Sequence, residues 1–346
     1  MEEEICCLEG PSDDDALLPL RTSLEPILAL CDAARYLAAK RLFDEWWEEH
    51  QGLVEWREEE EGCACSVNRA GSRAVKLMQL RAYESHKTLA EASLTTAEHD
   101  KWVLASTVGG ITCHYYVEED GIVTVRMQGS MKELPLFEQA AVIHEVDFFR
   151  TWIPLMTDSL RVQKLGHAEL IAYLSVWFPP IGRDTVIHAY AADCLNEHDT
   201  ILILGKSVET WPGAPLKECG WFHDRMDVQK FTAIIHVSAP DSAVTTIVAK
   251  VDPRTILPHA VVNLVVRNLA GLMLYYFQQK VQEVVRSPEG DVAQRIRANP
   301  GFYLHWLLPK LVSYCQYRGW PAVTPKYFQD DGDVLPAVTP LAPMGP

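Results

Sequence analysis

Residues 169–191 read ELIAYLSVWFPPIGRDTVIHAYA, two apolar runs separated by a short break. The runs Glu169–Phe178 and Thr185–Ala191 are rich in β-branched and aromatic residues, as buried β-strands are. Pro179 and Pro180 end the first run because proline cannot donate to the hydrogen-bond ladder of a strand. The break between the runs is too short for a crossover helix, so the two strands are predicted to be antiparallel.

The break also contains a charged pair, Arg183 and Asp184. We interpret it as a structural corner, at which the two side chains pair with each other or with neighbouring backbone and stay partly exposed. An exposed pair of this kind contributes little to stability, about 0–1 kcal/mol. Direct contact of Arg183 with a ligand and a catalytic role of the pair are the alternatives.

Strand-like alternation recurs on both sides of this region. Further strands are predicted at 111–117, 123–128, Thr200–Ser207, Phe231–Val237 and Thr245–Val251, and the first two form a hairpin. Strands that follow one another without crossover helices cannot form a parallel doubly wound sheet. The sequence therefore predicts an α+β fold in which a curved antiparallel sheet wraps a long C-terminal helix.

Helical periodicity appears in five stretches. They are 24–50, as one helix or a helical hairpin; 73–98, with Leu77, Leu80, Tyr83, Leu89 and Leu94 on or near one face; 135–155; Pro258 to about Val285; and 302–318. The fourth is apolar nearly all round, and its predicted stripe comprises Val261, Val262, Val265, Leu269, Leu272, Met273 and Tyr276. Such a helix is either a plain core helix or one wall of a hydrophobic cavity.

The charge of the chain is acidic and uneven. The net charge is −16, and residues 1–100 contribute −12 of it, from 22 acidic and 10 basic side chains. This balance argues against nucleic acid as a partner, but it is compatible with a local, transient membrane contact. The N-terminal sequence lacks the features of a signal peptide, and the nine cysteines are scattered. A cytoplasmic location is expected.

Three stretches and one tryptophan together resemble a known family, the StAR-related lipid transfer (START) domains. The stretches are EVDFFRTWIP at 145–154, GRDTVI at 182–187 and VDPRTILPHAVVN at 251–263, and the tryptophan is Trp102. The resemblance covers about 75–285 and implies the helix-grip fold with an internal lipid cavity. It departs from the family at Thr255, where a glycine is usual. Ala189 replaces the arginine of sterol-binding members, so an Arg–carboxylate contact to a sterol is not expected.

The expected organisation has four parts. Residues 1–22 are expected to be an acidic, disordered segment, and 23–74 a helical extension. Residues 75–285 are the START-like lipid-binding domain. Residues 286–346 are a C-terminal extension with one helix and a Pro-rich tail from Pro321, which we expect to be flexible.

A lipid site needs an apolar cavity, a few polar groups and a lid, and no reactive side chain. The predicted apolar wall comprises Tyr115, Val125, Met127, Ile187, Ile235, Ile247 and Ala249 from the strands, with Val265, Leu269, Leu272, Met273 and Tyr276 from the last helix. The predicted polar contacts are Glu169, Tyr173, Arg183 and His188. Each wall residue is equally compatible with a plain core. The last helix, with the loop Asp252–Pro258 before it, is the predicted gate.

No sequence motif points to catalysis or to a cofactor. The chain lacks a Gly-rich phosphate loop, a nucleophile elbow and a His-x-x-x-His metal helix. Cys63 and Cys65 have no second ligand pair at zinc spacing. We interpret His144-Glu145 as part of a helix surface. No metal, no cofactor and no enzymatic activity are expected.

The leading hypothesis is a soluble protein that binds or transfers one lipid in a cavity gated by the last helix. A second hypothesis is an interaction protein, in which the helical extension binds a protein partner and the cavity is regulatory or vestigial. A third is an enzyme on the same scaffold, such as a cyclase or hydrolase.

Overall fold

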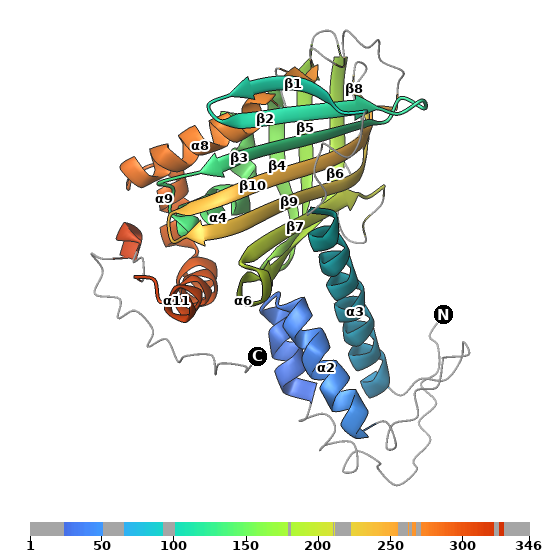
Figure 1. Cartoon of the computed structure of the whole chain (residues 1–346), viewed down its shortest axis with the longest axis vertical. Helices are drawn as coiled ribbons and strands as arrows, with labels where there is room; N and C mark the ends of the chain where they lie inside the picture. The colour runs from blue at the N-terminus through green and yellow to red at the C-terminus, as the bar shows by residue number, and fades with distance from the viewer. Residues whose placement is uncertain are drawn as a thin grey trace, which may run out of the picture. The chain divides into compact units, whose positions relative to one another are not determined.

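The structure is a computed structural model of the chain (Figure 1). It describes residues 24–50, 66–92, 101–178, 181–209, 211, 223–254, 262, 265–267, 271–321 and 325–328. The predicted disorder of 1–22, the Cys63/Cys65 pair and Leu269 lie outside these ranges. The chain divides into two compact units, Met1–Glu84 and Ser85–Pro346, which we describe separately.

The N-terminal unit begins with a helical hairpin, one of the two predicted alternatives. Residues 24–32 are helical, and α2 (Tyr36–His50) follows after Ala34, which reverses the chain with a φ of 59°. Helix α3 (Ser66–Ala92) begins in this unit. The core of the unit consists of Ile27, Ala39, Phe43, Trp46, Val75 and Met78.

Helix α3 turns a different side to the core than its leucine pattern indicates. Val75, Met78 and Ala82 are buried, whereas Leu77, Leu80 and Tyr83 are 43%, 53% and 63% exposed. On the buried side, the Arg81 guanidinium donates to the Tyr36 hydroxyl at 2.6 Å and lies over the Tyr36 ring. The buried face therefore includes a hydrogen-bonded arginine beside Val75, Met78 and Ala82, while two leucines and a tyrosine are exposed.

The second unit is built on one ten-stranded sheet, whose strands are labelled in Figure 1. The strands are β1 (Val103–Val108), β2 (Ile111–Val117), β3 (Val123–Met131), β4 (Met156–Gly166), β5 (Glu169–Phe178), β6 (Ile181–Cys194), β7 (Thr200–Ser207), β8 (His223–Arg225), β9 (Asp227–Ala239) and β10 (Ser242–Asp252). Their order is β1-β2-β3-β10-β9-β7-β6-β5-β4, with every neighbouring pair antiparallel, and the short β8 pairs in parallel with β6. The predicted antiparallel α+β fold is confirmed.

Three strands were not predicted, β1, β4 and β8. Strands β1 and β4 form the two ends of the sheet path. Most side chains of β4 are half-buried or exposed, and only Ser159 is buried. An edge strand of this kind lacks the apolar alternation on which the prediction depended.

The helices of this unit differ from the predicted ones mainly in their continuity. The predicted helix 135–155 is divided into α4 (Leu136–His144), η2 (Val146–Phe148) and α5 (Phe149–Trp152). The longest described part of the predicted long helix is α8 (Gly271–Arg286), which packs on α4 and on β1–β3. A short α6 (Leu195–His198) joins β6 to β7. The C-terminal helices are α9 (Asp291–Ala298), α10 (Pro300–Phe302), the π-helical η4 (Tyr303–Leu307), α11 (Leu308–Tyr317) and η5 (Lys326–Phe328).

These C-terminal helices belong to the core of the second unit. Phe302, Tyr303 and Tyr327 are buried in the same cluster as Cys113 of β2 and Met131 of β3. The predicted domain limits at 75 and 285 therefore do not coincide with the structural units. The domain continues beyond 285, because aromatic residues of the expected extension complete the core.

Candidate functional site

The two faces of the sheet are defined by what covers them. We call the face that carries the main core the inner face, and the opposite one the outer face. Of the predicted wall, Tyr115, Met127, Ile235 and Ile247 are buried in the main core, and Val125 packs against it. Strand register places Ala249 on the same face, since it pairs with Val125 and Phe231. The structure thus brings the predicted strand residues of β2, β3, β9 and β10 together.

The register of β6 extends the inner face toward β5 and β7. Ile187 and Ala189 pair with Ser207 and Gly205 of β7, and Ala191 pairs with Ile203, which packs against the main core. A Cβ atom added at Gly205 would lie 3.1 Å from Ile187 Cγ2 and 3.4 Å from Ala189 Cβ, so these three residues share a face. Ile187 is therefore an inner-face residue, as the predicted wall requires.

Small residues meet at the centre of this part of the inner face. Ala189, Ala191 and Gly205 come from β6 and β7, while Ala172 of β5 and Ala233 of β9 flank them through the pairs with Ile187 and Ile203. Larger apolar residues around them are only half-buried, namely Leu170, Leu174, Ile201, Ile203 and Phe231. A close-packed interior buries the apolar residues of central strands fully. The described strands thus leave apolar surface incompletely covered here.

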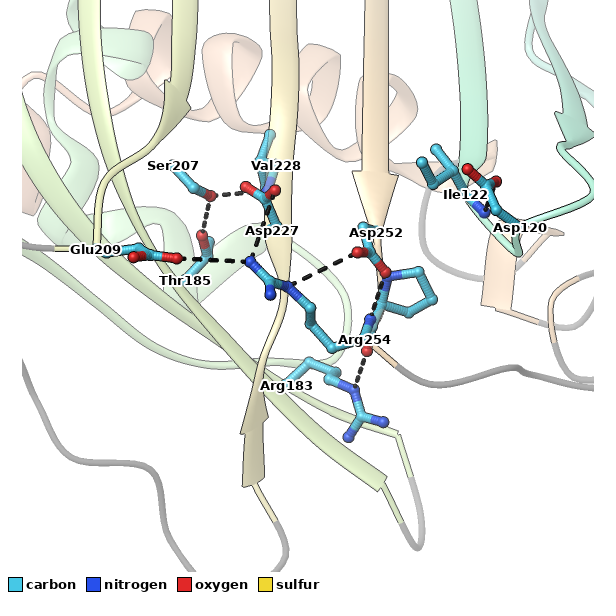
Figure 2. A network of polar contacts seen from close by, with 11 residues as sticks. Asp120, Ile122, Arg183, Thr185, Ser207, Glu209, Asp227, Val228, Asp252 and Arg254 are labelled. Atoms are coloured by element: carbon cyan, nitrogen blue, oxygen red, sulfur yellow. Dashed lines mark hydrogen bonds and ion pairs between the residues drawn. The ribbon is translucent and has the colours of Figure 1, made fainter.

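One end of the inner face has a polar rim (Figure 2). The Thr185 and Ser207 hydroxyls lie 2.8 Å apart, and Ser207 Oγ accepts a hydrogen bond from Val228 N at 2.7 Å. Arg254 lies just after β10 with a φ of 56°, a left-handed conformation that is costly for a residue with a side chain. Its backbone N–H donates to Asp252 Oδ1 at 2.7 Å, which stabilises the turn.

Two arginines hold the segment that follows β10. The Arg254 guanidinium lies 3.7–3.8 Å from carboxylate oxygens of Asp252, Asp227 and Glu209. Arg183 of β6 donates from Nε to the Pro253 carbonyl oxygen at 3.2 Å. The contacts of Arg183 and Arg254 therefore hold the backbone in place where the chain leaves β10 and continues toward α8.

The Arg183–Asp184 pair differs from the predicted exposed corner. Both residues lie within β6, which begins at Ile181, and successive strand residues point to opposite faces. Arg183 binds backbone carbonyls, as one part of the prediction states. Asp184, however, is only 1% exposed and accepts from Arg225 Nε at 2.9 Å and from the Tyr173 hydroxyl at 3.2 Å. The two side chains do not pair with each other, because the strand separates them.

The remaining predicted polar contacts lie on the outer face. Tyr173 packs with Ile171 and Val186 in a separate small cluster, and His188 is paired with Ile171 in the ladder. His188 Nε2 is 2.7 Å from Glu169 Oε1. Glu169, Tyr173 and His188 are thus brought close to one another but separated by the sheet from the apolar wall, and only Arg183 borders the inner face.

The α8 stripe is shifted from the predicted one. The buried residues are Leu274, Phe277, Val281 and Val284. Of the predicted contacts, Val265, Leu272 and Met273 are half-buried, and Tyr276 is 39% exposed. An apolar helix offers several stripes of similar hydrophobicity, and tertiary packing selects among them.

A second polar cluster was missed by the sequence reasoning and lies under the C-terminal helices. Glu145 is 2% exposed and accepts a hydrogen bond from the Tyr303 hydroxyl at 2.7 Å. Arg161 Nη2 donates to the His144 carbonyl oxygen at 2.6 Å. The interpretation of His144-Glu145 as helix surface was therefore wrong, because residues 158 positions away in the chain cover it.

The His144 ring belongs to a stack of aromatic rings. It lies 3.8 Å from the Phe302 ring, Phe302 lies 5.3 Å from Trp306, and Trp306 lies 5.4 Å from His167, all nearly parallel. Burial, reinforced by the positive charges of Arg161, Lys164 and His167, lowers the pKa of His144 to about 3. The neutral ring thus joins α4 to the C-terminal helices.

Among the described strand residues at the centre of the inner face, no ionisable groups suited to catalysis or metal binding gather. Burial raises the pKa of the Cys113 thiol to about 12, so it stays protonated at neutral pH. Within the described ranges, no group of three or more His, Cys, Asp or Glu residues could hold a metal ion. No helix in the described parts of the chain has the length and apolar character needed to cross a membrane.

Comparison with known proteins identifies the fold. No protein-family model matches the chain, and no curated protein sequence does. Among solved structures, human STARD10 matches with a TM-score of 0.51 and 18% identity over 71% of this chain and 91% of that one. Human StAR-related lipid transfer protein 5 matches at 0.49 and 16% identity over 59% and 96%, and the Zhui aromatase/cyclase from Streptomyces at 0.36 and 12% over 49% and 99%. The fold is START-like, as the sequence resemblance implies.

Proposed function

We propose that this protein binds a lipid or a similar hydrophobic small molecule on the inner face of the sheet and carries it without catalysis. The observation that carries the proposal is the group of small residues at the centre of the face, Ala189, Ala191 and Gly205, surrounded by half-buried larger apolar residues. Incompletely covered apolar surface of this kind is characteristic of ligand sites.

The chemistry of the face supports an apolar ligand portion. The described strand positions at its centre carry no charged side chain, and Ala189 with its ladder partner Leu170 occupies the middle. Each methylene buried there contributes about 0.8 kcal/mol, so a chain of about twelve methylenes would supply roughly 10 kcal/mol before ordering costs. Such a gain is sufficient to hold a lipid without covalent or ionic contacts.

The polar rim supports a gating role for the segment after β10. Arg183 and Arg254 restrain Asp252–Arg254, the first described residues of the predicted gate. Ligand exchange in this proposal requires the segment to move and these contacts to open. The restraints are partly exposed and therefore weak enough to be broken reversibly.

Native mass spectrometry of the purified full-length chain tests the proposal, followed by organic extraction of the bound material. We expect one hydrophobic molecule per chain, and we expect an emptied protein to take up labelled lipids from vesicles. A protein that is consistently empty and takes up none of them would refute the proposal.

A further inference from the structure

A pair of charged residues, Glu145 and Arg161, borders the inner face of the sheet. Arg161 of β4 is paired in the ladder with Ala172 of β5, and Ala172 is paired with the inner-face residue Ile187. Side chains of directly paired strand residues share a face, with Cβ atoms about 5 Å apart. Arg161 therefore lies on the inner face beside the small residues of the candidate ligand site. Glu145, at the C-terminal end of α4, forms an ion pair with it.

Each side chain of this pair has a polar atom without a hydrogen bond. Glu145 Oε1 accepts from the Tyr303 hydroxyl, but Oε2 lies 3.7 Å from Arg161 Nη2, too far for a hydrogen bond. Among the residues that the structure describes, Glu145 Oε2, Arg161 Nε and His144 Nε2 are buried and find no hydrogen-bond partner. Leaving such an atom unpaired is costly, so native proteins satisfy buried polar atoms with water or with a ligand.

The charges and the hydrogen-bonding capacity of these atoms define the group that would satisfy them. Glu145 and Arg161 have opposite charges, so a charged head group would leave an excess charge in a buried place, which is costly. The carboxylate oxygen only accepts hydrogen bonds, and the guanidinium Nε only donates. A neutral group that both donates and accepts satisfies both atoms. A hydroxyl is the smallest such group, and small size is required because the unpaired atoms are almost fully enclosed.

We propose that Glu145 and Arg161 bind the hydroxyl group of a neutral lipid whose apolar part lies along the inner face. The proposal rests on the carrier function above and specifies the class of its ligand. The hydroxyl oxygen accepts from Arg161 Nε, and the hydroxyl proton is donated to Glu145 Oε2. The apolar part extends past Ala172 toward Ala189. The Arg161 side chain is 18% exposed and that of Glu145 only 3%, so the pair is accessible at the arginine.

A competition experiment with the full chain tests the proposal. A fluorescent lipid dispersed in detergent is displaced by hexadecanol, by hexadecyl methyl ether or by hexadecyl sulfate, which share one alkyl chain. The ether keeps the acceptor oxygen of the alcohol but has no proton to donate, so it leaves Glu145 Oε2 unpaired. We expect the alcohol to bind at least about tenfold more tightly than the ether. We expect the sulfate to bind more weakly than the alcohol, because it adds a negative charge beside Glu145.

The variant Glu145→Gln separates hydrogen bonding from packing. Its amide keeps the size of the side chain and can still accept from Tyr303, but it presents a donor to the bound group. The preference for the alcohol over the ether should therefore fall to less than about threefold. A preference caused by the extra methyl group of the ether would persist. Asp184→Asn makes the same change at a buried carboxylate on the outer face, and it should leave the wild-type preference unchanged.

The outcomes separate this proposal from the carrier function. Thermal melts show which variants are folded, and if Glu145→Gln is not, the wild-type preference decides alone. Equal affinity of the wild type for alcohol and ether would overturn the proposal, as would a preference that Glu145→Gln leaves intact or that Asp184→Asn also removes. These results leave the carrier function standing, because the lipids still bind. A chain that takes up neither the fluorescent lipid nor any competitor would refute the carrier function, and the proposal with it.

Discussion

The two faces of the β5–β6 hairpin differ in the role of their side chains. On the outer face, Asp184 is bound by Arg225 and Tyr173, and Glu169 by His188. On the inner face, Ala189 and Ala191 are half-buried and have no polar atoms in their side chains. The polar residues that most resemble ligand contacts thus form hydrogen bonds and ion pairs with one another on the outer face. The inner face, with few polar side chains, leaves apolar surface available to a ligand. We expect ligand binding to depend on the inner face, and the stability of the fold to depend on both faces.

The largest effect is expected from the loss of Asp184, the buried carboxylate on the outer face. Asp184→Ala removes the acceptor of Arg225 and Tyr173, and it should lower the free energy of unfolding by about 2–4 kcal/mol. Urea denaturation measures the change. Asp184→Asn keeps one acceptor and should cost less. The folded fraction should bind lipid as the wild type does, and a loss of stability below about 0.5 kcal/mol would contradict the structural role.

The second prediction compares neighbouring residues on opposite faces. Ala189→Arg places a charge in the apolar centre and should weaken lipid uptake by more than about tenfold, or 1.4 kcal/mol. His188→Arg adds the same side chain one position earlier, on the outer face, and should leave uptake nearly unchanged. A fluorescent-lipid titration measures both. Equal losses in the two variants would show that the faces do not differ in ligand binding.

A third prediction concerns His144, a half-buried polar group outside the hairpin. Its pKa is lowered to about 3 in the folded state, whereas an unfolded chain has the ordinary value near 6.5. The unfolded state therefore binds more protons below pH 6.5, and the free energy of unfolding should fall as the pH falls, by at most about 1.4 kcal/mol per pH unit. His144→Phe keeps the stack with Phe302 and should reduce this slope between pH 6.5 and 5. An unchanged slope would exclude His144 as its source.

The smallest effect is expected at Glu169. Its pair with His188 is partly exposed on both sides, with side-chain exposures of 20% and 21%. Glu169→Gln should therefore cost less than about 1 kcal/mol, measured by thermal unfolding, with no change in lipid affinity. A clear loss of affinity would place the pair in the ligand site and reverse the comparison between the two faces.

The sequence predicted the antiparallel sheet and the order of most elements because alternation and short connections are local signals. It could not tell which face of β5 turns inward. Ile171 and Tyr173 alternate with Ala172 and Leu174, and both sets are apolar. The two-residue period of a strand therefore does not show which set faces inward. The polar candidates shared this ambiguity, and pairing with β6 placed Glu169, Tyr173 and His188 on the outer face. Only tertiary contacts resolve such a choice.

The prediction for His144 was wrong because it depended on residues that are far apart in the chain. The surface of α4 at His144 looked free because Phe302, which covers it, is far away in the sequence. On α3, Leu77, Leu80 and Tyr83 of the predicted apolar face are exposed. Ser85, Arg81 and Ala82 occupy the buried side instead, and nothing in their residue types indicates this.

The packing of Phe302, Tyr303 and Tyr327 into the main core has a consequence for synthesis on the ribosome. Strand β3 pairs with β10, which emerges more than one hundred residues later, and the aromatic residues that complete the core emerge after β10. A nascent chain that has reached residue 285 carries every strand of the described sheet but still lacks part of its interior. The sheet is therefore expected to keep apolar surface exposed until about residue 328 has left the exit tunnel. We expect the chain to need a chaperone most during this interval.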